Sequence, residues 1–176
     1  MSKFPFSPRR LDRWFCRPLL ALLLVLLCCR AVAHLSLVQG CSMRPTIRDG
    51  DRLVVESLSP RLGAIARFDV VILRNPRNQA EDFVKRVVGL PGERITFRRG
   101  RLLVDGRVVP EFFPKVVEFH DCREWVVPPE HYFVAGDNRP LYLDSRSFGV
   151  VPRTLLRGKV QYRLWPPARL GPLARD

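Results

Sequence analysis

The chain has 176 residues, of which 47% are hydrophobic, and it includes 16 prolines and 11 glycines. This length suits one domain with an appendage, and the composition excludes a disordered chain and a helical bundle in favour of a turn-rich β fold. The formal net charge of +13 fits either an anionic membrane surface or a nucleic acid. The membrane is favoured, because the basic residues are spread along the chain without a recognisable nucleic-acid-binding motif.

The N-terminal region has the pattern of a membrane anchor. Residues 1–13 are rich in arginine, and an uncharged stretch at 18–29 can be extended by its flanks to a span of 14–34. Such a span has the length of about 20 residues that a membrane helix requires. Positive charge before the span places the N-terminus in the cytoplasm and residues 35–176 outside. This topology predicts a cell-membrane protein with an extracytoplasmic domain.

Two other readings of this region stay open. A basic head and an apolar run that ends in Ala31-Val32-Ala33 also describe a cleaved secretory signal. Arg30 lies beside that site and disfavours cleavage. The other reading is a buried helical hairpin in a cytosolic protein.

The five cysteines do not form a metal pattern, because no C-x-x-C pair and no matching histidine spacing occurs. We therefore expect no metal and no other cofactor. Cys41 lacks an identifiable histidine partner that would make it a nucleophile. A Cys41–Cys122 disulfide is possible outside the cell.

The rest of the chain reads as short strands separated by turns, which predicts a mainly β domain of antiparallel sheets. The expected strands are 35–39, 52–57, 69–73, 83–89, 93–98, 101–104, 107–109, 132–135 and 159–164. Asp105-Gly106 between two of them is a strong signal for a two-residue hairpin.

A serine after the predicted anchor is a candidate nucleophile. Ser42 has small or flexible neighbours, and Pro45 biases Arg44 away from helix. These residues predict an exposed, extended turn. Because a serine hydroxyl is a weak nucleophile, it requires a base within hydrogen-bond reach.

Lys85 is the candidate base. In a strand over 83–88, alternation places Lys85 on one face with Phe83 and Val87, and Arg86 on the other. Burial on an apolar face lowers the pKa of a lysine and yields a neutral amine near pH 7. The alternative is a solvated lysine on an edge strand.

A third segment, 134–149, is rich in glycine, aspartate and asparagine and predicts a structured loop after the strand at 132–135. Asp144 and Arg146 can form an ion pair that stiffens it. Taken alone, this segment would be an ordinary capped loop.

Together the three segments resemble the type I signal peptidases, membrane-anchored proteases that use a serine and a lysine. The matching motifs are Ser42-Met43-Arg44-Pro45-Thr46, Lys85-Arg86-Val87-Val88-Gly89-Leu90-Pro91-Gly92-Glu93, and Gly136-Asp137-Asn138 with Asp144-Ser145-Arg146. The resemblance covers most of residues 35–165, and three motifs in this order are highly specific.

The resemblance implies a role for each matching residue. It implies that Ser42 is the nucleophile and Lys85 the general base. Supporting roles fall to Asp137, Asp144, Ser145 and Arg146, and substrate binding to Met43 and Pro45.

The chain departs from the family pattern at two positions. Tyr142 stands where the family often has a serine that orients the lysine, so Ser145 is a candidate for holding Lys85 instead. Gly40 stands where some members have an oxyanion-binding serine, which leaves the backbone N–H of Ser42 as one donor and the second donor unassigned.

These features predict a monomeric endopeptidase that removes signal peptides from preproteins at a lipid bilayer. A mitochondrial inner-membrane peptidase with the same chemistry is the nearest alternative. A self-cleaving regulatory protein would need a DNA-binding domain before the β fold, and a membrane-anchored β domain without catalysis is the remaining alternative.

Overall fold

The computed structural model describes residues 18–21, 32–117 and 123–173, and the chain divides into two compact units, 1–33 and 34–176. In the first unit, residues 18–21 are helical. No helix within the described ranges is long and apolar enough to cross a membrane. The predicted cytoplasmic segment 1–13 and most of the predicted anchor 14–34 lie outside the described residues.

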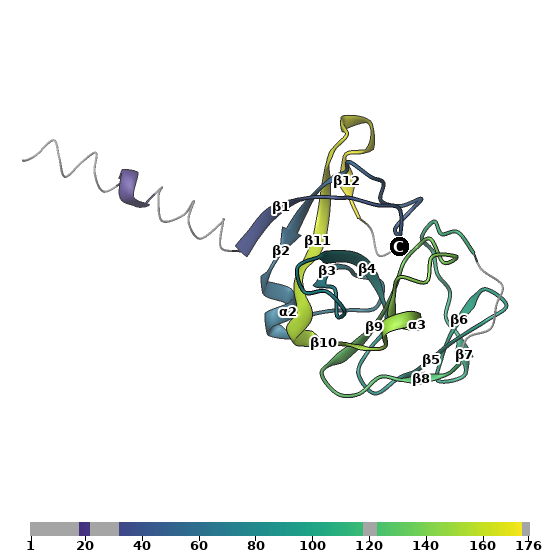
Figure 1. Ribbon diagram of the computed structural model, residues 1–176. Coiled ribbons are helices and arrows are strands. Elements are labelled where there is room, and N and C mark those ends of the chain that lie inside the picture. Colours follow the sequence, from purple (N-terminus) through teal and green to yellow (C-terminus); the bar gives the residue numbers. More distant parts are fainter. Residues whose placement is uncertain (1–17, 22–31, 118–122, 174–176) are drawn as a thin grey trace, which may run out of the picture. The chain divides into compact units, whose positions relative to one another are not determined.

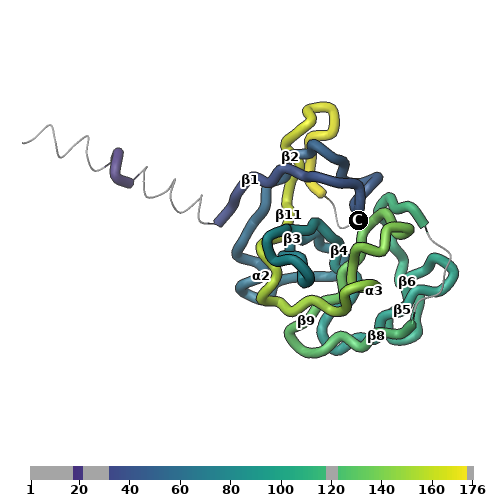
Figure 2. Tube along the Cα trace, in the orientation of Figure 1, coloured from purple at the N-terminus to yellow at the C-terminus, as the bar shows by residue number. Residues whose placement is uncertain are grey.

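The second unit is built on two β-sheets, as Figure 1 shows. The larger sheet contains eight strands: β1 (Ala33–Leu37), β2 (Arg52–Glu56), β3 (Val70–Arg74), β4 (Asp82–Gly89), β9 (His131–Ala135), β10 (Val151–Pro152), β11 (Leu156–Trp165) and β12 (Gly171–Pro172). Their order is β1-β2-β11-β3-β4-β9-β10, and β12 pairs with β11. Figure 2 shows the long strand β11 beside β2 and β3. The pairings from β2 onward are antiparallel, which confirms the predicted fold class.

The smaller sheet has the order β7-β6-β5-β8. Its strands are β5 (Arg94–Arg98), β6 (Arg101–Val104), β7 (Arg107–Val108) and β8 (Trp125–Val126). Asp105 and Gly106 join β6 to β7 with φ values of 50° and 77°. Positive φ at both central residues matches the strand twist in a two-residue hairpin, and the predicted hairpin is confirmed.

Each predicted strand overlaps an observed one, but several short elements were not predicted. The described helices of the second unit are α2 (Leu58–Leu62), α3 (Ser145–Phe148), and the 3₁₀ turns η1 (Arg153–Leu155) and η2 (Pro167–Arg169). Strands β8, β10 and β12 have two residues each, which is too short for an alternating pattern to be visible. Residues 145–148 were expected to be loop and instead form the single turn α3.

Strand β4 occupies the middle of the larger sheet, between β3 and β9. Both of its edges are therefore paired, and both of its faces are covered, because Val87 and Val88 are fully buried in different hydrophobic clusters. Lys85 and Arg86 are carried into the same interior, where they are 2% and 1% exposed. The alternative of a solvated lysine on an edge strand is wrong.

Candidate active site

The turn that carries Ser42 spans residues 41–47 and is closed by its own hydrogen bonds. Arg44 N donates to Cys41 O at 3.2 Å, and Ile47 N donates to Met43 O at 2.9 Å. Ser42 is half-buried. The prediction of an extended turn was wrong, because these local backbone bonds coil the segment instead.

Two apolar side chains anchor this turn in the core. Met43 is 2% exposed and Ile47 is fully buried, and both pack in one cluster with Leu53 and Val55. Pro45, in contrast, is exposed. The substrate-binding roles expected for Met43 and Pro45 stay predictions, and the structure adds that Met43 is a core residue.

The structure brings Lys85 and Ser42 together. Lys85 Nζ donates a hydrogen bond to Ser42 Oγ across 2.5 Å. The amine also lies 5.2 Å from the centre of the Phe83 ring, on the face predicted from alternation. A hydroxyl and an amine at this distance can exchange a proton directly.

Burial controls the charge state of Lys85. Loss of solvent around the amine lowers the pKa of Lys85 from 10.5 to about 8. The negative charge of Asp144 acts against this and raises the pKa, while Arg146 lowers it further. A useful fraction of the amine is therefore neutral at mildly alkaline pH.

The loop after β9 holds the Ser42 turn through its backbone. Asn138 N donates to Ser42 O at 3.0 Å, and Asn138 Nδ2 donates to Cys41 O at 3.2 Å. Gly136 lies so close that an added Cβ would meet Ser42 O at 2.4 Å. A side chain at position 136 would therefore push the turn away.

Asp144 and Arg146 form the ion pair expected from the sequence. Arg146 Nε and Nη2 donate to the two carboxylate oxygens of Asp144 at 2.9 and 2.7 Å. Asp144 also caps α3 by accepting from Arg146 N at 3.1 Å, and it accepts from Gly136 N at 3.1 Å. The carboxylate thus connects α3 to the glycine beside Ser42.

Ser145 and Tyr142 have other neighbours than the sequence suggested. Ser145 Oγ is fully buried and accepts from Val134 N of β9 at 3.0 Å. The Tyr142 ring is 40% exposed and lies 4.4 Å from the Arg146 guanidinium carbon. The observed bond of Ser145 fixes α3 on β9, and a role in holding Lys85 stays a prediction.

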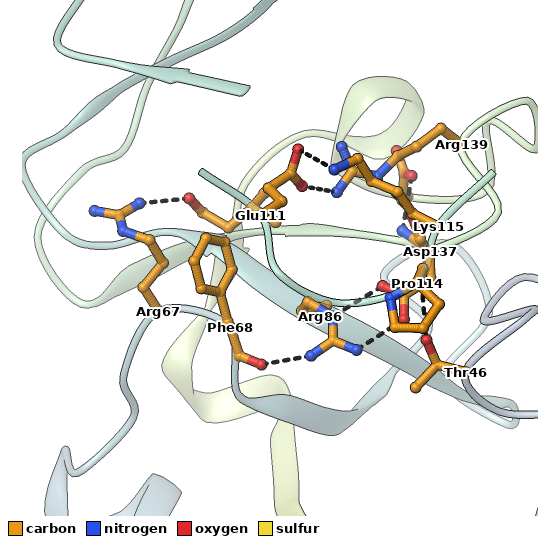
Figure 3. A network of polar contacts seen from close by, with 12 residues as sticks. Thr46, Arg67, Phe68, Arg86, Glu111, Pro114, Lys115, Asp137 and Arg139 are labelled. Atoms are coloured by element: carbon orange, nitrogen blue, oxygen red, sulfur yellow. Dashed lines mark hydrogen bonds and ion pairs between the residues drawn. The ribbon is translucent and has the colours of Figure 1, made fainter. Parts of the chain in front are cut away.

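A second buried pair lies behind the site and was not predicted. Arg86 Nε and Nη2 donate to the two oxygens of Asp137 at 2.9 and 2.8 Å, and Arg86 Nη1 donates to Phe68 O at 2.9 Å (Figure 3). Phe113 covers the guanidinium at 3.8 Å. The signal was present in the sequence, because a strand that is apolar on both faces buries its arginine and requires a carboxylate partner.

Gly40 and Cys41 lie just before Ser42. Gly40 N donates to Asp49 Oδ1 at 2.8 Å, so this N–H is already engaged. Cys41 is exposed. Cys122, its proposed disulfide partner, lies outside the described residues.

Comparisons with known proteins identify the family of this chain. A family model described as signal peptidase, peptidase S26, matches residues 11–165. The chain is 41% identical to a signal peptidase I of Bacillus caldolyticus, across 73% of this chain and 78% of the relative. It is 39% identical to the mitochondrial ATP-independent inner membrane protease subunit 1a of Arabidopsis thaliana, across 77% and 73%. A solved signal peptidase I from Enterococcus faecalis is 31% identical, with a TM-score of 0.47 over 54% of this chain and 95% of that one.

The matched range contains the Ser42 turn, strand β4 and the loop from 136 to 146. The identities to curated relatives extend over most of the chain and most of each relative. This chain therefore belongs to the signal peptidase family of serine proteases, peptidase S26.

Proposed function

We propose that this chain is a membrane-anchored endopeptidase that removes signal peptides from exported preproteins, with Ser42 as nucleophile and Lys85 as general base. One observation carries the proposal: Lys85 Nζ lies 2.5 Å from Ser42 Oγ, inside the protein. A buried amine with a lowered pKa is a base, and a serine beside such a base becomes a nucleophile.

The reaction has two stages. Neutral Lys85 takes the hydroxyl proton while Ser42 Oγ attacks the scissile carbonyl, and the resulting ammonium returns that proton to the departing amine of the mature protein. The signal peptide is then bound to Ser42 as an ester. Lys85 next removes a proton from a water molecule, which hydrolyses the ester and releases the signal peptide.

Four residues support this pair without taking part in bond changes. Asp144 and Arg146 act on the charge of Lys85 in opposite directions. Ser145 holds α3 against β9, and Asp137 neutralises Arg86, the neighbour of Lys85 in β4. Each therefore acts on the position or the charge of the reacting groups.

The substrate is an extended segment of a preprotein, bound as an added strand beside the Ser42 turn. Small side chains at the first and third residues before the cut would fit shallow pockets, with Met43 and Pro45 on the side of the nucleophile. The anchor at 14–34 would keep the N-terminus in the cytoplasm and residues 35–176 outside. It would confine enzyme and substrate to one membrane face, which raises their effective concentration.

A second candidate function is favoured by one comparison. The Arabidopsis mitochondrial protease subunit is almost as similar to this chain as the bacterial signal peptidase. Both candidates require the same Ser42 and Lys85 chemistry. They differ in substrate. Comparing the rates at which the enzyme cleaves a secretory preprotein and a mitochondrial inner-membrane precursor therefore distinguishes them.

The test uses purified full-length enzyme in vesicles and a preprotein with an Ala-x-Ala cleavage site. We expect Ser42→Ala and Lys85→Ala each to abolish cleavage while circular dichroism shows an unchanged fold. Ser57→Ala, a half-buried serine before α2, is the matched control and retains cleavage. Processing by either active-site variant would refute the assignment.

A further inference from the structure

Thr46 belongs to the turn that carries Ser42. Two segments that lie outside the three motifs form hydrogen bonds with it. Its hydroxyl Oγ1 donates to Pro114 O at 3.0 Å. Its carbonyl accepts from Arg163 Nη1 at 2.8 Å. Thr46 lies four residues after the nucleophile, so a movement of Thr46 moves the same short turn.

The first of these segments is the end of β11 with the turn η2. Arg163 lies on β11 with a side chain that is 15% exposed, and its Nε donates to Arg169 O. Arg169 in turn pairs with both oxygens of Asp51, which is fully buried and accepts from Arg48 N at 2.9 Å. Residues 163–169 therefore contact the Ser42 turn directly at the Thr46 carbonyl. Through Asp51 they are also linked to Arg48, just after the turn.

The second segment is the strap, residues 110–117, which runs beside the loop after β9 and forms a parallel bridge between Val116 and Asn138. Val116 N donates to Asp137 O at 2.9 Å, and Arg139 N donates to Val116 O at 3.1 Å. Glu111 lies between Arg139 and Lys115, and Figure 3 shows Thr46 reaching Pro114 at the other end of the same network. The strap therefore fixes Thr46 relative to the loop that contacts Ser42.

Packing does not fix Thr46 on this side, because a pocket adjoins it. The pocket has a volume of about 350 Å³, and its lining includes Pro45, Thr46, Phe113, Pro114 and Arg163. Met43 and Ile47 anchor the turn in the core, and the two hydrogen bonds of Thr46 restrain it where it faces this open space.

We propose that Thr46 is a positioning residue for Ser42, held in place by Arg163 of β11 and by Pro114 of the strap. The inference rests on the proposed function. Proton transfer from Ser42 Oγ to Lys85 Nζ needs the short contact that the turn now provides, and a displacement of about 1 Å can reduce a rate by about 100-fold. The loss should appear mainly in kcat, because proton transfer depends more steeply on the distance between Ser42 Oγ and Lys85 Nζ than substrate binding does.

The test measures kcat and KM for preprotein cleavage by the full-length enzyme, with thermal unfolding recorded for each variant. Thr46→Val keeps the shape and removes the hydroxyl, whereas Thr46→Ser keeps the hydroxyl. Arg163→Leu removes the donor to the Thr46 carbonyl. Arg157→Leu is the matched control, because Arg157 lies on the same strand, is 47% exposed and pairs with Asp82 at 3.6 Å.

We expect kcat to fall about 10-fold in Thr46→Val and between about 10- and 100-fold in Arg163→Leu, with KM nearly unchanged. Thr46→Ser and Arg157→Leu should stay close to wild type. Positioning is overturned if Thr46→Val and Arg163→Leu keep wild-type kcat, or if kcat in Thr46→Ser falls as far as in Thr46→Val. If wild type and Ser42→Ala cleave equally, the proposed function itself has failed and the inference falls with it.

Discussion

At the scale of single residues, β4 buries two adjacent basic side chains, Lys85 and Arg86, whose polar partners differ. Arg86 is paired with the carboxylate of Asp137 through two hydrogen bonds. The hydrogen bond of Lys85 reaches a neutral hydroxyl, and burial lowers the pKa of this lysine to about 8. We therefore expect a structural role for the guanidinium and a reactive role for the amine.

The activity should follow the charge of Lys85 as pH changes. Only the neutral amine accepts a proton, so kcat/KM should rise with pH and level off above about 8, losing about tenfold per pH unit on the acid side. Asp144 raises the pKa of Lys85, so Asp144→Asn should move the midpoint of this rise to lower pH, while Asn retains a capping oxygen for α3. Arg146 lowers that pKa, so Arg146→Gln should move the midpoint to higher pH.

The measurement is a pH–rate profile of kcat/KM for each enzyme, under conditions where circular dichroism shows a folded protein. Ser57→Ala provides a profile that should coincide with that of wild type. Shifts of Asp144→Asn and Arg146→Gln in the same direction would contradict the assignment of the titrating group to Lys85.

At this scale the sequence predicted the contact between Lys85 and Ser42 but not the buried ion pair of Arg86 and Asp137. Alternation within β4 was sufficient to place Lys85 on an apolar face, because that argument needs only neighbouring residues. Pairing Arg86 with Asp137 requires knowing that β9 lies beside β4, and the sequence alone does not specify strand order. The same limit hid the contact between Asn138 and the Ser42 turn.

At the scale of elements, strands were predicted well where alternation or turn residues define them, as in β4 and the β6–β7 hairpin. Helix α3 was missed because it is one turn long and depends on Asp144, whose carboxylate caps it and also binds Gly136 N. A helix of this size has no periodicity that a sequence pattern could reveal.

The loop after β9 should control the position of the nucleophile. Gly136→Ala places a methyl group 2.4 Å from Ser42 O, so the Ser42 turn or the loop must move. We expect kcat to fall about 10- to 100-fold while the protein remains folded. Steady-state cleavage kinetics and thermal unfolding of the same preparation test this.

Gly89→Ala is the matched control, because its Cβ would lie 2.5 Å from Ile95 Cγ1, in a hydrophobic cluster that does not include Met43 or Ile47 of the Ser42 turn. This variant should lower the unfolding temperature without changing kcat per folded molecule. If both glycine variants lose kcat only in proportion to their loss of stability, Gly136 has no special relation to the nucleophile.

At the scale of the whole molecule, a compact catalytic unit follows a basic and apolar N-terminal region. The Ser42 and Lys85 contact lies entirely within residues 34–176. The chemistry and the proposed attachment to a membrane are therefore separable. This separation allows the contribution of the anchor to be measured by itself.

Removal of residues 1–31 should leave cleavage of a short soluble peptide nearly unchanged. It should lower the rate on a preprotein inserted in vesicles by about 100-fold, because the enzyme then reaches its substrate from bulk solution instead of along the membrane face. The test is to measure cleavage rates of the full-length and the truncated enzyme on both substrates. Equal losses on both would mean that the removed region supports the catalytic unit, and no loss on either would mean that attachment contributes nothing to the rate.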